Sequence, residues 1–296
     1  MQLDRGQLAA LSAVLTTGSF DRAARSLGVT QSAVSQRLKA LEERLGCVLV
    51  VRGQPCVATA SGERLCRHAD ELALLERKLS DDIGVRSTGT DFPILRIAVN
   101  ADSLATWFVE AMALSGDFLF DLKLDDQAVS AEWLRRGEVW AAVSSESAPV
   151  QGCDVSSLGG QAYIAAASPA FIERWFNKGV SFESLSKAPA LTFNAKDGLP
   201  SGWSKQVYGR AVSPRTHWVA SATAYVEACV RGIGWGLHPH SMIADDLSSG
   251  RLIALVPETP YVVPLFWHVS RAVQESLSPV SEAVRRVARR SLLQLD

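Results

Sequence analysis

Between residues 31 and 39 the chain carries amides, hydroxyls and positive charges beside an apolar pattern. Apolar residues recur at spacings of four, three and four from Val34 to Leu45, which predicts a helix with one buried face. The side chains off that face are Gln31, Ser32, Ser35, Gln36, Arg37 and Lys39. Amides and hydroxyls bind base edges in a major groove, and cations bind phosphates. This pattern therefore predicts a helix that contacts double-stranded DNA, although a merely solvated polar face remains the alternative.

Two further helices and a hairpin are expected to position this helix. An apolar face runs from Leu8 to Leu15 before Gly18, and a shorter helix from Phe20 ends at Gly28. Residues 28–30 alone join it to the next helix, the short turn of a helix-turn-helix. Apolar runs at 48–51 and 56–59 predict a two-stranded wing that places Arg52 near the DNA backbone.

Charge is distributed unevenly along the chain. The 296 residues are 47% hydrophobic and carry a formal net charge of -1, a globular composition long enough for two or three compact units. Residues 1–67 hold nine Lys or Arg against five Asp or Glu, so this part is at +4 and the rest at -5. The asymmetry favours an anionic partner for the N-terminal part. The N-terminus resembles neither a signal peptide nor a membrane anchor, so we expect a cytoplasmic protein.

A long helix and a linker follow the wing. Residues 61–84 contain no Pro, and Leu65, Leu72 and Leu79 recur every seven residues, which predicts an apolar seam that pairs with a second copy of the chain. Packing of this helix on its own domain is the alternative. Residues 84–93 are rich in Gly, Ser and Thr and predict a linker. Beyond it, short β-rich runs alternate with helical stretches, which predicts an α/β fold with largely parallel sheets.

The sequence shows no pattern for a cofactor or a metal. No GxGxxG, P-loop or GxSxG motif is present. The cysteines are scattered along the chain, which predicts reduced thiols. His238 and His240 are separated by Pro239 and have no third metal ligand nearby, which favours structural roles for both histidines. Arg285, Arg286, Arg289 and Arg290 are expected on the solvated face of a terminal amphipathic helix, with a second DNA contact as the alternative. We expect no enzyme.

The stretch from Phe20 to Arg52 resembles the DNA-binding signature of the LysR-type transcriptional regulators. TQSAVSQ at 30–36, LEERLG at 41–46 and Arg52 carry the resemblance, and Thr59 to Gly62 is similar to the TxxG entry into the family's linker helix. It implies a winged helix-turn-helix over 1–60, a dimerisation helix and hinge over 61–90, and an effector domain over 91–296. The resemblance also implies that this domain has two α/β lobes like a periplasmic binding protein: lobe I from 91–161 plus 266–296, and lobe II from 162–265.

Other phrases resemble the ArgP/LysG branch of that family, regulators of basic amino acid export. They are AVNADSLATWF at 98–108, WLRRGEVWAAVS at 133–144, SPAFIERWF at 168–176 and HPH at 238–240, whereas 145–160 and 194–214 show no branch-like pattern. The resemblance implies a homodimer or tetramer that binds promoter DNA and L-lysine or L-arginine and engages RNA polymerase to activate an exporter gene. A LysR-type regulator or repressor with a different effector, and an amino-acid-binding transport protein, are the alternatives.

An effector site between the lobes is expected from this resemblance. Ser103 and Thr106 begin the helix after a strand and would hold the effector's carboxylate, with helix capping as the alternative. Asp125 and Asp126 would bind a basic side chain, unless they form a solvated turn, and Asp102 is a weaker candidate. The remaining polar lining is expected from Ser144, Ser221 and Thr223, and Trp107 either walls the site or packs in the core.

Overall fold

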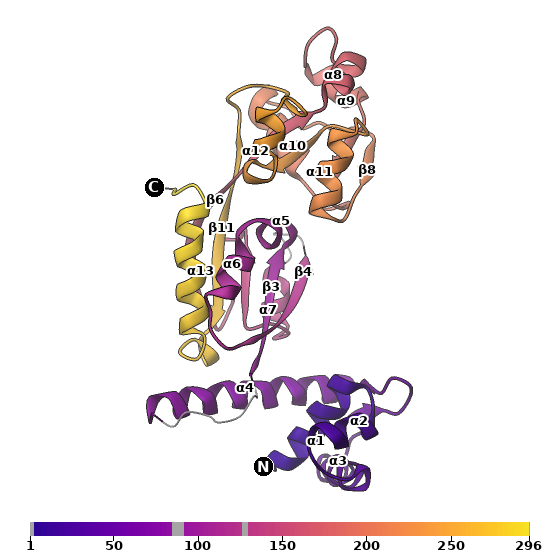
Figure 1. Cartoon of the computed structure of the whole chain (residues 1–296), viewed down its shortest axis with the longest axis vertical. Coiled ribbons are helices and arrows are strands. Elements are labelled where there is room, and N and C mark those ends of the chain that lie inside the picture. The colour runs from indigo at the N-terminus through magenta and orange to yellow at the C-terminus, as the bar shows by residue number, and fades with distance from the viewer. Residues whose placement is uncertain (1–2, 85–91, 126–129, 296) are drawn as a thin grey trace. The chain divides into compact units, whose positions relative to one another are not determined.

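The computed structural model describes residues 3–84, 92–125 and 130–295. The chain divides into two compact units, Met1–Pro93 and Ile94–Asp296, which are drawn in Figure 1. Among the described residues, no helix is both long and apolar enough to cross a membrane.

The N-terminal unit is a winged helix-turn-helix followed by a long helix, as predicted. Its elements are α1 (Arg5–Thr17), α2 (Phe20–Ser26), α3 (Gln31–Leu45), β1 (Val50–Val51), β2 (Val57–Ala58) and α4 (Ala60–Asp82). Leu11 and Val14 of α1 pack with Val34, Leu38 and Leu41 of α3 in a closed core. The two wing strands pair antiparallel.

Local caps fix where these helices begin and end. The side chain of Asp4 accepts a hydrogen bond from the Gln7 backbone N–H at 2.9 Å, and Thr30 Oγ1 accepts one from Ala33 at 3.2 Å. Gly18 and Gly46 close α1 and α3 in the left-handed conformation. These contacts explain why α3 begins at the first residue of the QSAVSQ pattern.

The entry into α4 depends on Thr59 and Gly62. Thr59 Oγ1 donates to the Val48 carbonyl at 2.8 Å and accepts from the Gly62 N–H at 3.1 Å. A Cβ at Gly62 would lie 2.1 Å from the Leu49 carbonyl oxygen, so a larger residue would push the helix off the wing. The TxxG pattern is therefore explained by packing.

The second unit is built on a mixed sheet with strand order β10-β6-β11-β5-β3-β4, and β9 pairs with β6. The strands are β3 (Ile94–Asn100), β4 (Leu119–Asp125), β5 (Ala141–Ser144), β6 (Cys153–Ala167), β9 (Gly236–Pro239), β10 (Ile253–Ala254) and β11 (Tyr261–Ser270). β3 runs parallel to β4 and β5, but β6 and β11 pair antiparallel with all their partners. The expectation of largely parallel sheets was therefore wrong, because the two longest strands reverse direction beside each other.

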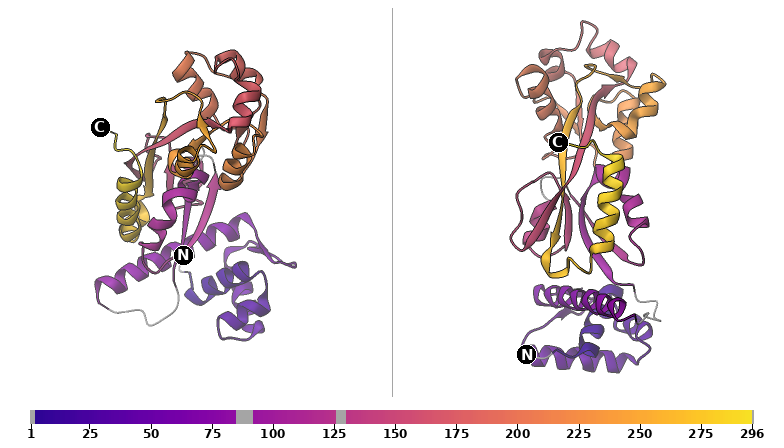
Figure 2. Two further views of the ribbon diagram at one scale, coloured as in Figure 1. Left: turned by 45° about the horizontal axis from the view of Figure 1, so that its top comes forward. Right: turned by 90° about the vertical axis from the view of Figure 1, so that its left-hand side faces the viewer.

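Two lobes share the long strands β6 and β11, which run through both (Figure 2). We call lobe I the part around β3, β4 and β5. Its helical elements are α5 (Ala101–Ser103), a π-helical turn (Leu104–Phe108), α6 (Val109–Ala113), α7 (Ser130–Arg135) and α13 (Ser278–Ser291), and a 3-10 turn (Arg271–Val273) follows β11.

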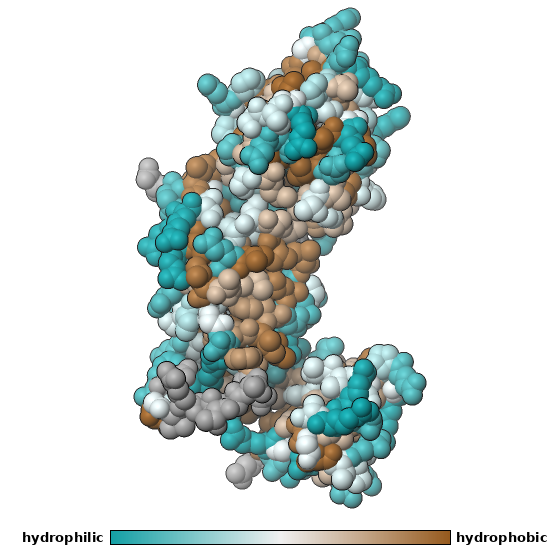
Figure 3. Space-filling view, in the orientation of Figure 1, coloured by the Kyte–Doolittle hydropathy of each residue, from teal (hydrophilic) through white to brown (hydrophobic). Residues whose placement is uncertain are grey.

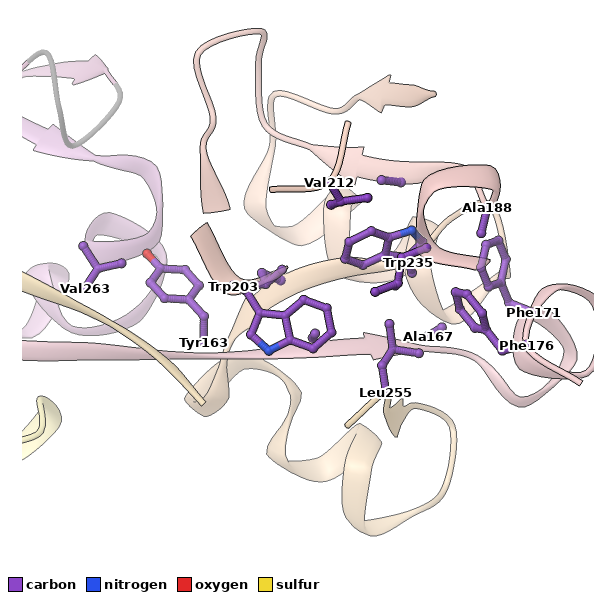
Figure 4. Packing of buried hydrophobic residues seen from close by; sticks show 14 residues of the cluster. Tyr163, Ala167, Phe171, Phe176, Ala188, Trp203, Val212, Trp235, Leu255 and Val263 are labelled. Atoms are coloured by element: carbon purple, nitrogen blue, oxygen red, sulfur yellow. The ribbon is translucent and has the colours of Figure 1, made fainter. Parts of the chain in front are cut away.

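Lobe II is the part between the two long strands in sequence. It contains α8 (Pro169–Trp175), α9 (Phe182–Lys187), α10 (Leu199–Tyr208), α11 (Ala222–Val230) and α12 (His240–Ser248), and β7 (Ala190–Thr192) pairs parallel with β8 (Thr216–Trp218). Figure 4 shows its aromatic core, where the rings of Trp203 and Trp235 lie 5.9 Å apart beside Phe171 and Phe176. This closely packed core supports the residues at the edge of lobe II.

Candidate functional site

The outer face of α3 carries polar side chains. Gln31, Ser32, Gln36 and Lys39 are exposed, and Ser35 is half-buried. Because Val34, Leu38 and Leu41 are buried on the opposite side, the core fixes this orientation. The face offers amide, hydroxyl and ammonium groups along about two turns of helix.

Two of the predicted cations have protein contacts of their own. The ammonium of Lys39 lies 3.6 Å from the Glu43 carboxylate one turn along, with both side chains largely exposed. Arg37 is half-buried, and its guanidinium carbon lies 3.8 Å from where a Cβ on Gly6 would be, so it lies against the start of α1. Lys39 is thus the more accessible of the two.

The wing is tied to the helices by two residues of the sequence signature. Glu42 Oε1 accepts hydrogen bonds from the backbone N–H groups of Leu49 at 2.8 Å and Val50 at 3.3 Å, which fixes the first wing strand. The guanidinium of Arg52 lies over the Phe20 ring, 5.1 Å from its centroid, while Arg52 remains exposed. Much of the LEERLG motif therefore serves the fold of this unit.

A small cavity lies between the two lobes of the second unit. It has a volume of about 20 Å³, room for about one water molecule. Lobe I contributes Asp102, and lobe II contributes side chains from the loop after β7, from α10 to α12 and from β9. The lobe II residues are Phe193, Asp197, Leu199, Ala222, Tyr225, Val226, Leu237, His238, Pro239 and Met242.

Acidic residues of both lobes face this cavity. The Tyr163 hydroxyl on β6 donates to Asp102 Oδ2 at 2.8 Å. Asp197 accepts backbone hydrogen bonds from Phe193 at 2.9 Å and Leu199 at 3.0 Å, so it also holds the loop that leads into α10. Two carboxylates around a small space favour a cationic ligand.

Buried uncharged groups complete the lobe II wall. The Tyr225 hydroxyl donates to the Leu191 carbonyl at 2.8 Å, and burial, helped by Asp197, raises the pKa of this phenol well above its usual value. His238 is fully buried, its ring edge-on to Tyr225 at 4.8 Å between centroids. Burial lowers the pKa of this imidazole to about 3, so the ring is neutral near pH 7.

The predicted carboxylate-binding hydroxyls lie inside the first helical segment of lobe I. The helix begins at Ala101, two residues earlier than expected: Asn100 caps it and accepts from the Ser103 backbone N–H at 2.7 Å. Ser103 is fully buried, and its hydroxyl has no hydrogen-bond partner among the described residues. Thr106 Oγ1 donates to the Asp102 carbonyl at 2.6 Å. Ser144 is buried at the end of β5, where its hydroxyl accepts from the Glu146 N–H at 3.1 Å.

Ser103, Thr106 and Ser144 are not among the residues that line the cavity. The other predicted effector residues also lie apart from the cavity lining or outside the described side chains. Trp107 is 2% exposed and packs edge-on against Phe108 in lobe I, the core role that the sequence had left open. Ser221 caps α11 and lies 3.3 Å from the Thr223 hydroxyl, and both are exposed. Asp125 ends β4 beside Asn100 of β3, whereas Asp126 falls outside the described residues.

Two expectations about charged and metal-binding groups can also be compared with the structure. The four arginines of α13 are exposed while Val284, Val287 and Ala288 are buried, which confirms an amphipathic terminal helix. Within residues 3–84, 92–125 and 130–295, no group of three His, Cys, Asp or Glu is placed to hold a metal ion. His240 is exposed and is not among the lining residues, so of the two histidines in the HPH segment it is His238 that lines the cavity.

Sequence reasoning missed three cavity residues, Asp197, Tyr225 and His238. Asp197 lies in the stretch 194–214, where no branch-like pattern was found, and Tyr225 lies in one of the helical stretches that alternate with the β-rich runs, in which it was not singled out. The one available signal was a histidine at the end of a short apolar strand, in Gly236–Pro239.

Comparison with known proteins adds two family matches that together span most of the chain. Residues 6–63 match the bacterial regulatory helix-turn-helix protein model of the lysR family, and residues 94–293 match the LysR substrate binding domain. The chain belongs to the LysR family. Its members are DNA-binding transcriptional regulators, and the helix-turn-helix model matches the part of the chain that contains α3 and the wing. A transport protein would leave residues 6–63 unexplained.

Relatives of this LysR-family chain include LysG and ArgP regulators. The regulator LysG of Mycobacterium tuberculosis H37Rv is 40% identical over 97% of this chain and 94% of its own length. The regulator ArgP of Pseudomonas fluorescens Pf0-1 is 39% identical over 98% of each chain. The similarity therefore includes both units.

Solved structures of ArgP and LysG proteins are similar to this chain over nearly its whole length. The crystal structure of ArgP from M. tuberculosis has a TM-score of 0.77 at 39% identity and covers 99% of this chain and all of its own. Full-length LysG from Corynebacterium glutamicum with bound effector Arg has a TM-score of 0.65 at 35% identity, covering 98% of this chain and all of its own.

Proposed function

We propose that this LysR-family regulator responds to L-lysine or L-arginine and activates a gene for a basic amino acid exporter. The observation that carries the proposal is the pair of acids, Asp102 of lobe I and Asp197 of lobe II, at one interlobe cavity. The bound Arg in the LysG structure supports the same class of ligand. A cationic side chain between two carboxylates gains charge-assisted hydrogen bonds that a neutral side chain lacks.

Binding is expected to change how the lobes sit on each other. The cavity of about 20 Å³ is too small for an amino acid, so the effector enters only when the lobes part or the side chains rearrange. The hydrogen bond from Tyr163 to Asp102 joins a shared strand to lobe I, and a cation at Asp102 competes with it. The effector then favours whichever arrangement binds it better, which is the requirement for regulation.

On DNA, the proposal assigns base reading and phosphate binding to different residues. Gln31, Ser32, Ser35 and Gln36 contact base edges in the major groove. Lys39 and Arg52, with Arg37 at the flank of the helix, contact phosphates and supply salt-dependent affinity. Effector binding changes the spacing of two such helices and their engagement with RNA polymerase.

The proposed assembly is a homodimer that forms tetramers. Leu75 and Leu79 of α4, and Ile83 directly after it, are 44%, 60% and 65% exposed, an apolar seam suited to a second copy. Apolar side chains also gather on the face of lobe I near α6 and β4, where Val109 and Leu119 are exposed (Figure 3). In this proposal the protein acts in the cytoplasm, uses no cofactor and catalyses no reaction.

A ligand screen tests the effector class. Purified full-length protein is heated with each of the twenty amino acids, and with L-citrulline and L-norleucine, which resemble arginine and lysine but lack the side-chain cation. We expect the unfolding midpoint to rise with lysine or arginine and not with the neutral pair, because a ligand that binds only the folded state stabilises it. A rise with a different metabolite alone would discard the basic amino acid and keep the DNA-binding regulator.

A second measurement tests the link to DNA. Footprints on the promoter beside a candidate exporter gene are compared with and without the amino acid found in the screen. The proposal requires that protection or DNA bending differ between the two states. Identical footprints at every position, and unchanged transcription from that promoter in vitro, would contradict it.

A further inference from the structure

His238 is the most unusual polar group in the wall of the interlobe cavity. It is 0% exposed, and neither Nδ1 nor Nε2 has a hydrogen-bond partner among the described residues. Buried polar atoms are nearly always paired, and an unpaired one costs about 1–3 kcal/mol. A ring with two such nitrogens at a cavity therefore points to a partner that arrives from outside the protein.

The neighbours of the ring do not supply that partner. The Tyr225 ring packs against the imidazole in a T-shaped arrangement, and its hydroxyl donates a hydrogen bond to the Leu191 carbonyl. Ile164, which pairs with His238 across β6 and β9, offers an apolar side chain. The ionisable groups that share the cavity are Asp102 and Asp197, together with Tyr225.

This setting decides what kind of atom the imidazole meets. A neutral imidazole has one nitrogen that accepts a hydrogen bond and one that donates. A ligand cation drawn in by the two carboxylates carries N–H groups, which need acceptors once the ligand is out of water. The carboxylates supply charge, and the imidazole supplies an uncharged acceptor that does not repel a cation.

We propose that His238 is an effector-contacting residue whose unprotonated ring nitrogen accepts a hydrogen bond from the ammonium or guanidinium group of the basic amino acid. This inference rests on the proposed function, because it assumes a cationic effector at this cavity. It goes further by assigning a specific acceptor, on the lobe II strand β9, that sequence reasoning had left with a structural role.

Calorimetric titration of the full-length protein with L-lysine and L-arginine tests this assignment. His238→Phe keeps a flat ring and removes both nitrogens, and we expect affinity for the parent's effector to fall about tenfold or more, the loss of a hydrogen bond to a charged group. His238→Asn and His238→Gln place a carbonyl oxygen near the position of one ring nitrogen or the other. One of them is expected to recover most of the affinity.

Two controls separate a lost contact from damage to the fold. His240→Phe changes the exposed histidine of the same segment and is expected to bind like the parent. His238→Phe without ligand is expected to unfold at the parent's midpoint or above it, since two unpaired buried nitrogens are gone. If this variant does not fold, His238→Leu takes its place in the titration.

The outcomes are distinguishable from failure of the proposed function. If the parent binds neither lysine nor arginine, the proposed effector class falls and this assignment falls with it. If the parent binds one of them and a folded His238→Phe or His238→Leu binds it within twofold of the parent, only the role of His238 is overturned. Loss of affinity in the apolar variant with rescue by Asn or Gln supports the contact.

Discussion

In the N-terminal unit the candidate contacts stand on one exposed helix face, whereas in the second unit they come from several elements and are partly or fully buried. Gln31 and Lys39 are eight residues apart and share α3. Asp102 and His238 face one cavity from α5 and β9, which belong to different lobes. Residues on the exposed face of α3 can be substituted without disturbing a core. Substitutions at the interlobe cavity do disturb the structure, because the polar groups there also hold loops and strands together.

The largest effect that would sharpen this comparison is expected at Asp102. Asp102→Ala should weaken lysine or arginine binding about 30-fold or more, because truncating one partner of a charge pair that the ligand buries costs about 2–5 kcal/mol. Titration calorimetry measures the change, and Asp245→Ala, an exposed acid on α12, is the matched control. Full binding by Asp102→Ala, with loss in Asp125→Ala or Asp126→Ala, would move the cation site to the end of β4.

A pH series tests the buried histidine of the second unit. The folded pKa of His238 is about 3, below the usual 6.5, so the unfolded chain takes up the proton first. Proton linkage at His238 therefore leaves the stability of the fold unchanged above pH 6.5 and lowers it as the pH falls from 6.5 toward 3. Between pH 7.5 and 4.5 the parent should lose on the order of 2–3 kcal/mol more of its unfolding free energy than His238→Phe. Urea unfolding at both pH values measures this, and equal losses would mean that the ring is hydrated.

On the exposed face of α3 a single change should alter DNA selectivity without altering stability. Gln31→Ala is expected to reduce promoter affinity about tenfold, since one good base contact is worth about 1–3 kcal/mol, while affinity for unrelated DNA stays the same. Lys39→Ala should weaken both equally and lower the salt slope by about 1. Gel shifts over a range of salt concentrations give both numbers. An equal loss on both DNAs for Gln31→Ala would remove it from the base-reading set.

The smallest effect is expected at Ser221. This residue belongs to the second unit but is exposed, like the residues on the face of α3. Ser221 accepts the Ala224 N–H at the start of α11, so Ser221→Ala should cost about 1 kcal/mol of stability through the lost cap. Thr223→Ala is the control, because Thr223 lies two residues further along and takes no part in the hydrogen bond that caps the helix at Ala224. Unchanged effector affinity in both variants would assign Ser221 to capping, and a drop in affinity with unchanged stability would restore it to the effector site.

Much of the N-terminal unit could be predicted because its information is local. The period of Val34, Leu38 and Leu41, the Thr30 cap and Gly46 lie within a few residues of the contacts that they form. The same local rules correctly gave the amphipathic helix α13. They failed for the sheet direction in the second unit, because β6 and β11 pair across about a hundred residues of sequence.

By itself the sequence determined the winged helix-turn-helix, the polar face of α3 and the resemblance to LysR-type regulators, since helical periodicity and capping act over three or four residues. Only the tertiary structure decided which polar groups face the interlobe cavity. It brought Asp102, Asp197 and His238 together, and it buried Trp107 in a core. The physical reason is that a cavity is formed by the packing of distant segments, and burial, which sets both the pairing and the protonation of a side chain, is a property of that packing.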